Sequence, residues 1–250
     1  MIDIHSHLLP AVDDGSPSIE VSVAVLRQFA ADGVARLVCT PHLKASQAAL
    51  VDDAAYAERF AALVEAAPAV PRLERGWEIM LDVPGSDLRA KRFALAGSTA
   101  VLIEFPHSGV PTGATQELYR LRMTGIVPVL AHPERYQGCT TELVREWRRI
   151  GIVMQIDALA LLAGGPMGEL ARALLEQGLA DCLSSDNHGD TRSLVGARAW
   201  LVEIGAEEQA MLLTSTNAGR LLSGVAPLPV AEVAIPRGLL RRLRSLLGKR

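Results

Sequence analysis

The chain has 250 residues, of which 49% are hydrophobic and 4% aromatic, and its formal net charge is −3. This length and composition fit one large domain with an aliphatic core, and the small negative charge excludes a general affinity for nucleic acid. Three widely spaced cysteines argue against a disulfide framework. Because the first residues do not resemble a signal peptide and no apolar run is long enough for a membrane span, we expect a cytoplasmic protein.

Short β-rich runs alternate with helical patterns along the chain. The expected strands are residues 2–5, 36–40, 72–78, 100–105, 127–132, 152–157 and 180–184. The expected helices are residues 18–32, 52–66, 112–124, 140–150, 167–177 and 191–204. Glycines that end a helix before the next strand recur four times, at Gly33, Gly125, Gly151 and Gly178. This alternation predicts an α/β fold of parallel strands with outer helices, and seven strands favour a closed or nearly closed barrel.

The last part of the chain differs from the rest in charge. We expect a barrel domain in residues 1–227, followed by a linker and a basic tail in residues 228–250. Residues 236–250 contain six Lys or Arg side chains and no acid, and their leucines share one face of a helix. This amphipathic tail is expected to pack on the barrel or on a second subunit, to lie on an anionic membrane, or to dock on a partner protein.

Histidines and carboxylates recur where the predicted strands end. The histidines are His5, His7, His42, His132 and His188, and the carboxylates are Asp3, Asp14, Glu78, Glu104 and Asp186. Because the carboxyl ends of parallel barrel strands share one rim, we expect these side chains to converge there. For the sixth histidine, His107, a loop position is favoured over the site, and Asp157 is a weaker candidate ligand than the others.

Carboxylates crowded among imidazoles repel one another unless cations lie between them. Glu104 ends an otherwise apolar strand, where a carboxylate needs a partner, and His5 and His7 are alternate residues that point the same way. Imidazole and carboxylate donors suit Mn, Fe or Zn, and the nine donors other than Asp3 exceed the capacity of one ion. The sequence therefore predicts a centre of two or three divalent metal ions.

Several motifs in this order resemble a known family. They are HSHLLP from His5 with DDG from Asp13, TPH ending at His42, GWEI around Glu78, LIEFP around Glu104, AHPERY around His132 and SDNH ending at His188. The pattern resembles the PHP superfamily and, within it, the bacterial CpsB/CapC/YwqE-type tyrosine phosphatases, over residues 1 to about 220. The chain departs from the group at three places. Leu43 stands where many relatives carry a second histidine, and residues 44–50 are rich in Ala and Gln. Asn187 stands where the group often has a small residue.

The resemblance implies a PHP-type distorted (β/α)7 barrel with a trinuclear centre, Mn being favoured over Fe and Zn. The implied metal ligands are His5, His7, Asp14, His42, Glu78, Glu104, His132, Asp186 and His188. Arg135 and Arg192 are implied to bind the phosphate and act in catalysis. The implied substrate is phosphotyrosine on a kinase that regulates capsular or exopolysaccharide synthesis. The sequence does not fix the oligomeric state, and a homo-oligomer is one of the alternatives.

The absence of a credible protein nucleophile beside so many metal donors favours direct attack on phosphorus by a metal-activated hydroxide. The spacing from Cys139 to Arg145 also fits the Cys-x5-Arg pattern of cysteine-dependent phosphatases, but the loop lacks glycine, contains Glu142, and places Thr140 at a helix start. A small-molecule phosphatase acting on a compound like histidinol phosphate, a nuclease, and a non-catalytic PHP module are the remaining alternatives.

Overall fold

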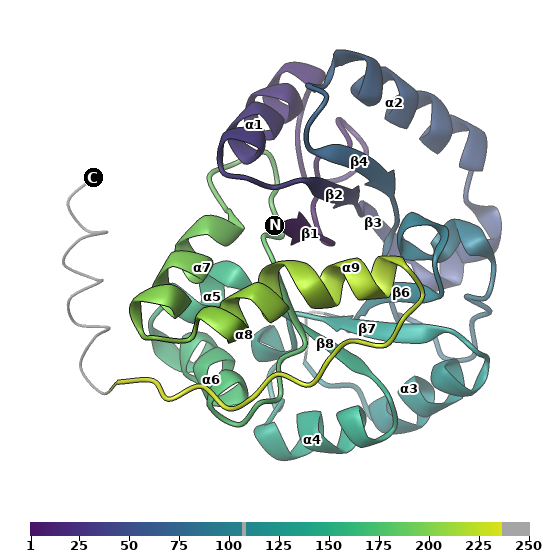
Figure 1. Ribbon diagram of the computed structural model, residues 1–250. Coiled ribbons are helices and arrows are strands. Elements are labelled where there is room, and N and C mark those ends of the chain that lie inside the picture. The colour runs from purple at the N-terminus through teal and green to yellow at the C-terminus, as the bar shows by residue number, and fades with distance from the viewer. Residues whose placement is uncertain (107–108, 237–250) are drawn as a thin grey trace.

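The computed structural model describes residues 1–106 and 109–236. His107 and the basic part of the tail therefore lie outside the described residues. Within this part of the chain, short parallel strands occupy the centre of the molecule and helices surround them (Figure 1). The predicted α/β class with outer helices is confirmed.

The strands form two parallel sheets. The first has the order β1-β2-β4, formed by β1 (Ile2–Asp3), β2 (Arg36–Cys39) and β4 (Arg72–Arg75). The second has the order β3-β5-β6-β7-β8-β9, formed by β3 (His42–Lys44), β5 (Glu78–Met80), β6 (Ala100–Glu104), β7 (Val127–Ala131), β8 (Val153–Asp157) and β9 (Cys182–Ser184). Within each sheet, the strands lie side by side in the order in which they follow along the chain.

Two continuous runs of the chain contribute one strand to each sheet. The short strands therefore make up the seven runs of a distorted barrel. Strand β3 continues the run of β2, and β5 continues that of β4; the two runs stay paired through the N–H of Gly76, which donates to the carbonyl of Cys39 at 3.0 Å. At the other end, Ser6 after β1 forms a parallel bridge with Asn187 after β9, and the His7 N–H donates to the Asn187 carbonyl at 2.7 Å. These contacts connect the first run to the last.

The prediction of one unbroken strand at residues 72–78 was wrong, and β3 was not predicted. Both breaks have local causes. Pro41 lacks the N–H that a ladder requires. A Cβ on Gly76 would lie 2.9 Å from Val38 Cγ1 and 2.8 Å from Leu95 Cδ2, so only glycine lets the chain bend closely over the core at this point. The bends direct β3 and β5 toward the mouth of the barrel.

The six expected helices are present with shifted ends. They are α1 (Ile19–Ala31), α2 (Asp53–Ala66), α3 (Ala114–Met123), α4 (Thr141–Arg149), α6 (Gly165–Glu176) and α7 (Leu194–Glu203). Side chains of Ser18, Asp52 and Thr140 accept backbone N–H groups at the starts of α1, α2 and α4. The short helices were not predicted: α5 (Ala158–Leu162), α8 (Glu207–Met211), a π-helical turn (Leu212–Thr216) and α9 (Asn217–Leu222).

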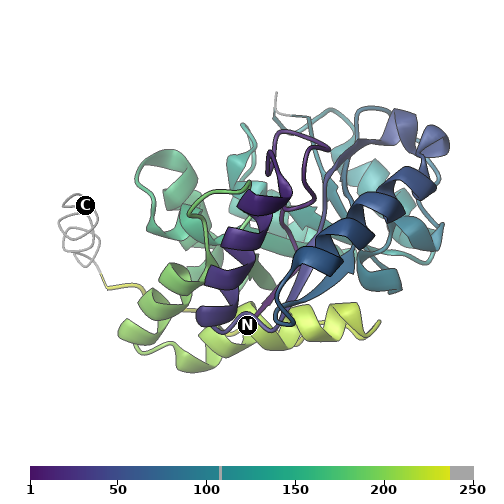
Figure 2. The same ribbon diagram turned by 90° about the horizontal axis from the view of Figure 1, so that it is seen from above.

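Helix α9 closes the barrel at the amino ends of the strands. It lies across this opening in Figure 1, and in Figure 2 the yellow-green helices α8 and α9 run along the bottom of the molecule. Its Ala218, Leu221 and Leu222 belong to a buried cluster with inward-facing residues of the strands, such as Leu102 and Val129. A second, larger cluster lies between the strands and the outer helices. The interior of the barrel at its amino end is therefore filled by apolar side chains, and the polar side chains of the barrel interior gather at the opposite mouth.

After α9, the chain runs back over the outside of the barrel. Val230 and Val233 are buried, and the Val233 N–H donates to the Leu175 carbonyl at 3.2 Å. Among the residues described, no helix combines the length and the apolar composition that crossing a bilayer would require.

Candidate metal centre

The nine predicted ligands all lie at the mouth formed by the carboxyl ends of the strands. Eight of them lie in or next to strands: His5 and His7 after β1, His42 opening β3, Glu78 opening β5, Glu104 ending β6, His132 after β7, and Asp186 and His188 after β9. Asp14 lies in the loop that follows β1 and reaches back over the mouth. Segments nearly two hundred residues apart in sequence thus meet at one place, as strand direction requires.

Two of these residues have strained backbone conformations. His132 and Asp186 have φ values of 35° and 49°, in the left-handed region that residues other than glycine seldom adopt. Each follows the end of a strand, where the turn directs its side chain into the mouth. Such strain persists only where the surrounding structure holds it, and it concentrates at functional sites.

Glu78 is the centre of the deeper group. Its Oε2 atom lies 3.2 Å from Nε2 of both His5 and His7, and 3.0 Å from Nδ1 of His42, while its Oε1 lies 2.8 Å from Nε2 of His132. Asp186 Oδ1 lies 3.2 Å from the same two nitrogens of His5 and His7. One buried carboxylate therefore faces four imidazole rings.

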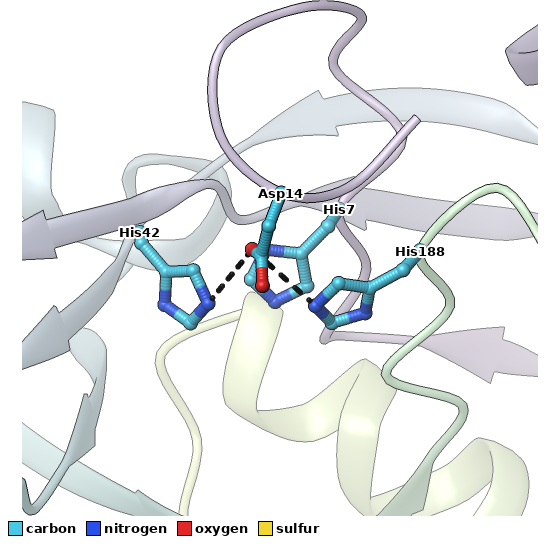
Figure 3. Close-up of side chains that lie close together, drawn as sticks. All are labelled: His7, Asp14, His42 and His188. Atoms are coloured by element: carbon cyan, nitrogen blue, oxygen red, sulfur yellow. Dashed lines mark ion pairs between the residues drawn. The ribbon is translucent and has the colours of Figure 1, made fainter. Parts of the chain in front are cut away.

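A second group lies nearer to solvent and is drawn in Figure 3. Asp14 Oδ1 lies 3.4 Å from His42 Nε2 and 3.7 Å from His188 Nε2, and the ring of His7 stacks on that of His188 with centroids 4.1 Å apart. The Asp14 side chain is largely exposed, whereas His7 is buried. The outer group thus opens to the medium and shares His7 and His42 with the deeper one.

The donor set fits divalent cations. Four groups of side chains each bring their ligand atoms within 4.8 Å of one another: His7, Asp14, His42 and His188; His5, Glu78 and His132; His5, His7 and Asp186; His42, Glu78 and Glu104. Glu78 Oε2 and both carboxylate oxygens of Glu104 are buried without a hydrogen bond. Buried carboxylate oxygens in this state are costly, and a cation would satisfy them together with the imidazole nitrogens around them.

Neighbouring side chains hold the imidazoles in one tautomer. Nδ1 of His7 donates to Asp13 Oδ2 at 2.7 Å, and Nδ1 of His5 donates to Gln155 Oε1 at 2.8 Å. Nδ1 of His188 donates to a backbone carbonyl, that of Asp186, at 2.9 Å. In all three rings Nε2 is left facing the centre, which is the arrangement that metal-binding histidines adopt. Sequence reasoning missed the roles of Asp13 and Gln155.

The electrostatic field of the site is strongly negative. Burial lowers the pKa of His42, but the carboxylates of Glu104 and Glu78, 3.2 and 3.0 Å from its Nδ1, outweigh this effect and raise the pKa to about 10. Burial also lowers the pKa of His7, yet Asp13, Asp186 and Glu78 raise it well above its ordinary value. A field that holds protons on imidazoles this firmly also attracts divalent cations, which compete for the same nitrogens.

Both predicted phosphate-binding arginines lie at the edge of the cluster. Arg135 Nη2 lies 2.7 Å from Asp186 Oδ2 and also pairs with Asp157. Arg192 Nη1 lies 3.4 Å from the same Asp186 oxygen, and its Nε donates to Asp190 at 2.8 Å. Both side chains are partly exposed. Two guanidinium groups thus flank the candidate metal-binding groups on the side of Asp186.

Known proteins match both the sequence and this geometry. The family model described as "Capsular polysaccharide synthesis, CpsB/CapC" matches residues 1–223. The chain belongs to the CpsB/CapC family. The tyrosine-protein phosphatase YwqE of Bacillus subtilis is 33% identical over 242 residues, 89% of this chain and 91% of that protein. CpsB of Streptococcus pneumoniae, also named a tyrosine-protein phosphatase, is 32% identical over 206 residues, 75% of this chain and 83% of that one.

A solved structure supports the CpsB/CapC fold directly. A chain from the crystal structures of YwqE from Bacillus subtilis and CpsB from Streptococcus pneumoniae, described as unique metal-dependent tyrosine phosphatases, superposes with a TM-score of 0.78 at 26% identity and covers 95% of this chain and 100% of that one. A β-aspartyl dipeptidase from Fervidobacterium islandicum AW-1 gives a TM-score of 0.55 at 15% identity, covering 94% of this chain and 76% of that one, which shows a shared fold alone. The predicted family and barrel class are confirmed.

Two other carboxylates at strand ends, Asp157 and Asp3, have other partners. Asp157 belongs to none of the four donor groups; its side chain pairs with Arg135 and accepts the Leu159 N–H at 2.8 Å to cap α5. Asp3, which ends β1, accepts N–H bonds from His5 at 3.3 Å and Ser185 at 3.2 Å, and burial raises its pKa to about 6. These two carboxylates support the backbone of the site.

The Cys-x5-Arg segment does not form a phosphate cradle. Thr140 caps α4 by accepting the Leu143 N–H, and Arg145 donates to Gln177. Burial raises the pKa of the Cys139 thiol to about 12, so it stays protonated at neutral pH. This geometry argues against the cysteine mechanism.

Proposed function

We propose that this chain is a metal-dependent protein-tyrosine phosphatase that hydrolyses phosphotyrosine on a kinase regulating capsular or exopolysaccharide synthesis. Its named relatives are tyrosine-protein phosphatases, and the family description refers to capsular polysaccharide synthesis. The observation that carries the proposal is the convergence of imidazoles and carboxylates beside two partly exposed arginines.

The nine predicted ligands would hold the metal: His5, His7, Asp14, His42, Glu78, Glu104, His132, Asp186 and His188. We propose two or three ions, because the four donor groups share members and each imidazole nitrogen binds a single ion. Manganese is the favoured ion, with iron or zinc as alternatives, since all three accept nitrogen and carboxylate ligands. When bound, such ions would activate water at neutral pH and stabilise the negative charge on the oxygens of the phosphoryl group during its transfer.

Arg135 and Arg192 would bind the phosphate. A phosphoryl transition state spreads negative charge over its equatorial oxygens, and guanidinium groups match such oxygens with paired N–H donors. Asp157 and Asp190 hold the two guanidinium groups in place before substrate arrives. Both arginines now face Asp186, so a phosphate that binds here shares their charge with that carboxylate.

The test is a substrate panel with manganese-loaded protein: a tyrosine-phosphorylated peptide, the same peptide phosphorylated on serine, and histidinol phosphate. We expect hydrolysis of the phosphotyrosine peptide with the highest kcat/KM. Arg192→Ala should lower kcat/KM by about tenfold or more, as expected when a charge-assisted phosphate contact is lost. Arg27, exposed on α1, provides the control variant Arg27→Ala, which should behave as the wild type. Preference for histidinol phosphate would support the small-molecule alternative and contradict our proposal.

A further inference from the structure

A cationic pocket lies on the face opposite the metal centre. It has a volume of about 650 Å³ and lies where the loops Thr99–Ala100 and Gly151–Ile152 enter strands β6 and β8. Each of these strands has five residues, so the pocket and the metal-binding mouth are about 15 Å apart along the barrel wall. The pocket is therefore separate from the proposed phosphatase site, and its volume is that of a small-molecule site.

Four arginines line this pocket against one acid. Arg122 lies in the last turn of α3, and Arg145, Arg148 and Arg149 lie on one side of α4. The acid, Asp181, accepts from Arg148 at 2.7 Å, and Arg148 also donates to the Gly178 carbonyl. This ion pair is structural, because it ties α4 to the start of β9.

Three guanidinium groups are left without a carboxylate in the pocket lining. Arg145 donates to the Gln177 side-chain carbonyl, and Arg122 donates to the Ile126 backbone carbonyl at 3.3 Å. Arg149 is exposed and has no hydrogen-bond or ion-pair partner among the described residues. The three charges are therefore available to an anion.

Helix dipoles do not account for so many cations. Helices α3 and α4 both end at this pocket, and each helix end carries about half a negative charge. Against four guanidinium groups, one carboxylate and two helix ends leave a net charge of about +2. The arginines that stabilise the helix ends thus still leave an excess of positive charge facing the cavity.

Apart from Thr99, the rest of the lining is apolar. Val127 and Val153 contribute from the starts of β7 and β8, Leu179 from the loop before β9, and Leu221 and Pro227 from α9 and the segment after it. A simple anion such as phosphate would use the guanidinium groups and leave this surface uncovered. A ligand that satisfies both parts carries phosphate at one end and an apolar or flat ring at the other, on which a guanidinium plane can stack.

We propose that this pocket binds a phosphate-bearing small molecule with a flat apolar body, of the class of nucleoside diphosphates. Arg145 and Arg149 contact the phosphates from one helix, Arg122 contacts them from the next, and the aliphatic lining contacts the ring. The pocket touches the amino ends of the strands whose other ends carry Glu104 and precede His132, so the ligand binds to the same rigid wall as the metal centre.

The test is calorimetric titration of the metal-loaded protein with adenosine 5′-(α,β-methylene)diphosphate, which a phosphomonoesterase cannot hydrolyse. We expect a saturable site that is weakened by about tenfold or more in Arg149→Glu and in Arg145→Ala, since each loses a charge-assisted contact. Arg149→Glu should fold normally because Arg149 has no hydrogen-bond or ion-pair partner within residues 1–106 and 109–236, and circular dichroism checks this. Arg27→Glu, at another exposed helix arginine, is the matched charge control and should bind as the wild type does.

Two further arms locate the ligand and define its class. Arg192→Ala alters the metal-centre side alone and should leave the affinity unchanged. Adenosine and methylenediphosphonate should each bind more weakly than the complete nucleotide. The proposal is overturned if no saturable binding occurs, if Arg192→Ala abolishes binding while Arg149→Glu retains it, or if either fragment binds as tightly as the nucleotide.

Discussion

Asp13 allows a sharp test of how the centre is built, because it holds two predicted ligands without being one. Its Oδ2 accepts from His7 Nδ1 at 2.7 Å and from the His42 backbone N–H at 3.0 Å, and its Oδ1 accepts from the Gly15 N–H at 3.0 Å. Burial raises its pKa, but the bond to His7 and the charge of that ring outweigh burial, so the pKa is lowered. Asp13 is therefore an anion that fixes the tautomer of His7.

The change Asp13→Asn keeps the shape of the side chain and removes its charge. One of its two oxygen positions becomes an amide NH2, which then faces an N–H donor. We expect the affinity for the first bound divalent ion to fall by about 10–100-fold, the effect of losing a partner that orients a ligand. The free energy of unfolding of the metal-free protein should fall by about 1–3 kcal/mol, because a charge-assisted hydrogen bond is lost.

Metal affinity is measured by competition with a chromophoric chelator, and stability by urea unfolding at constant pH. Asp52→Asn is the matched control: Asp52 also accepts two backbone N–H groups, at the start of α2, and asparagine caps helices equally well. Wild-type metal affinity in Asp13→Asn, together with an unchanged Asp52→Asn, would refute the claim that Asp13 prepares His7 for metal.

Three further changes test other parts of the structure. Gln155→Leu leaves His5 Nδ1 buried without its acceptor and should weaken metal binding by about tenfold in the same competition assay; unchanged affinity would contradict the role of Gln155. Burial raises the pKa of Glu134 from 4.5 to about 8, so the folded state holds a proton that the unfolded state releases, and stability falls as pH rises between these values. Relative to Glu134→Gln, the wild type should lose about 2 kcal/mol in urea unfolding between pH 5.5 and 7.5, a window inside that range, and parallel curves would refute this. Cys139→Ser should retain full phosphatase activity because the thiol is buried and protonated, and a large loss would reinstate the cysteine mechanism.

The convergence of the predicted ligands could be foreseen from the sequence because of one geometric rule. Parallel strands end on one rim, so polar residues at strand ends, such as Glu104 and His132, must converge whatever the exact strand boundaries are. The rule does not give register or side-chain partners. Gln155 lies inside an apolar strand, where its polarity was a signal, but its contact with His5 depends on how the first and sixth runs of the barrel face each other.

The parts of the fold that were missed depend on contacts distant in sequence. The split near Gly76 arises because the chain bends over Val38 and Leu95, which no local pattern records. Helix α9 has only six residues, too few for a hydrophobic period to be recognised, and it is stabilised by filling the amino end of the barrel. The sequence predicted a role for Asp14 and none for its neighbour Asp13, because only the folded loop directs Asp13 toward His7 and Asp14 toward His42 and His188.

The central claim is tested most directly by counting metal ions in the protein. Elemental analysis of the purified chain, saturated with manganese and then desalted, should give two to three ions per chain, and Glu78→Gln should bind fewer because it alters the carboxylate that faces four imidazoles. Phosphotyrosine hydrolysis should fall with the metal content in both proteins. Fewer than one ion per chain in a protein that remains fully active would contradict the account.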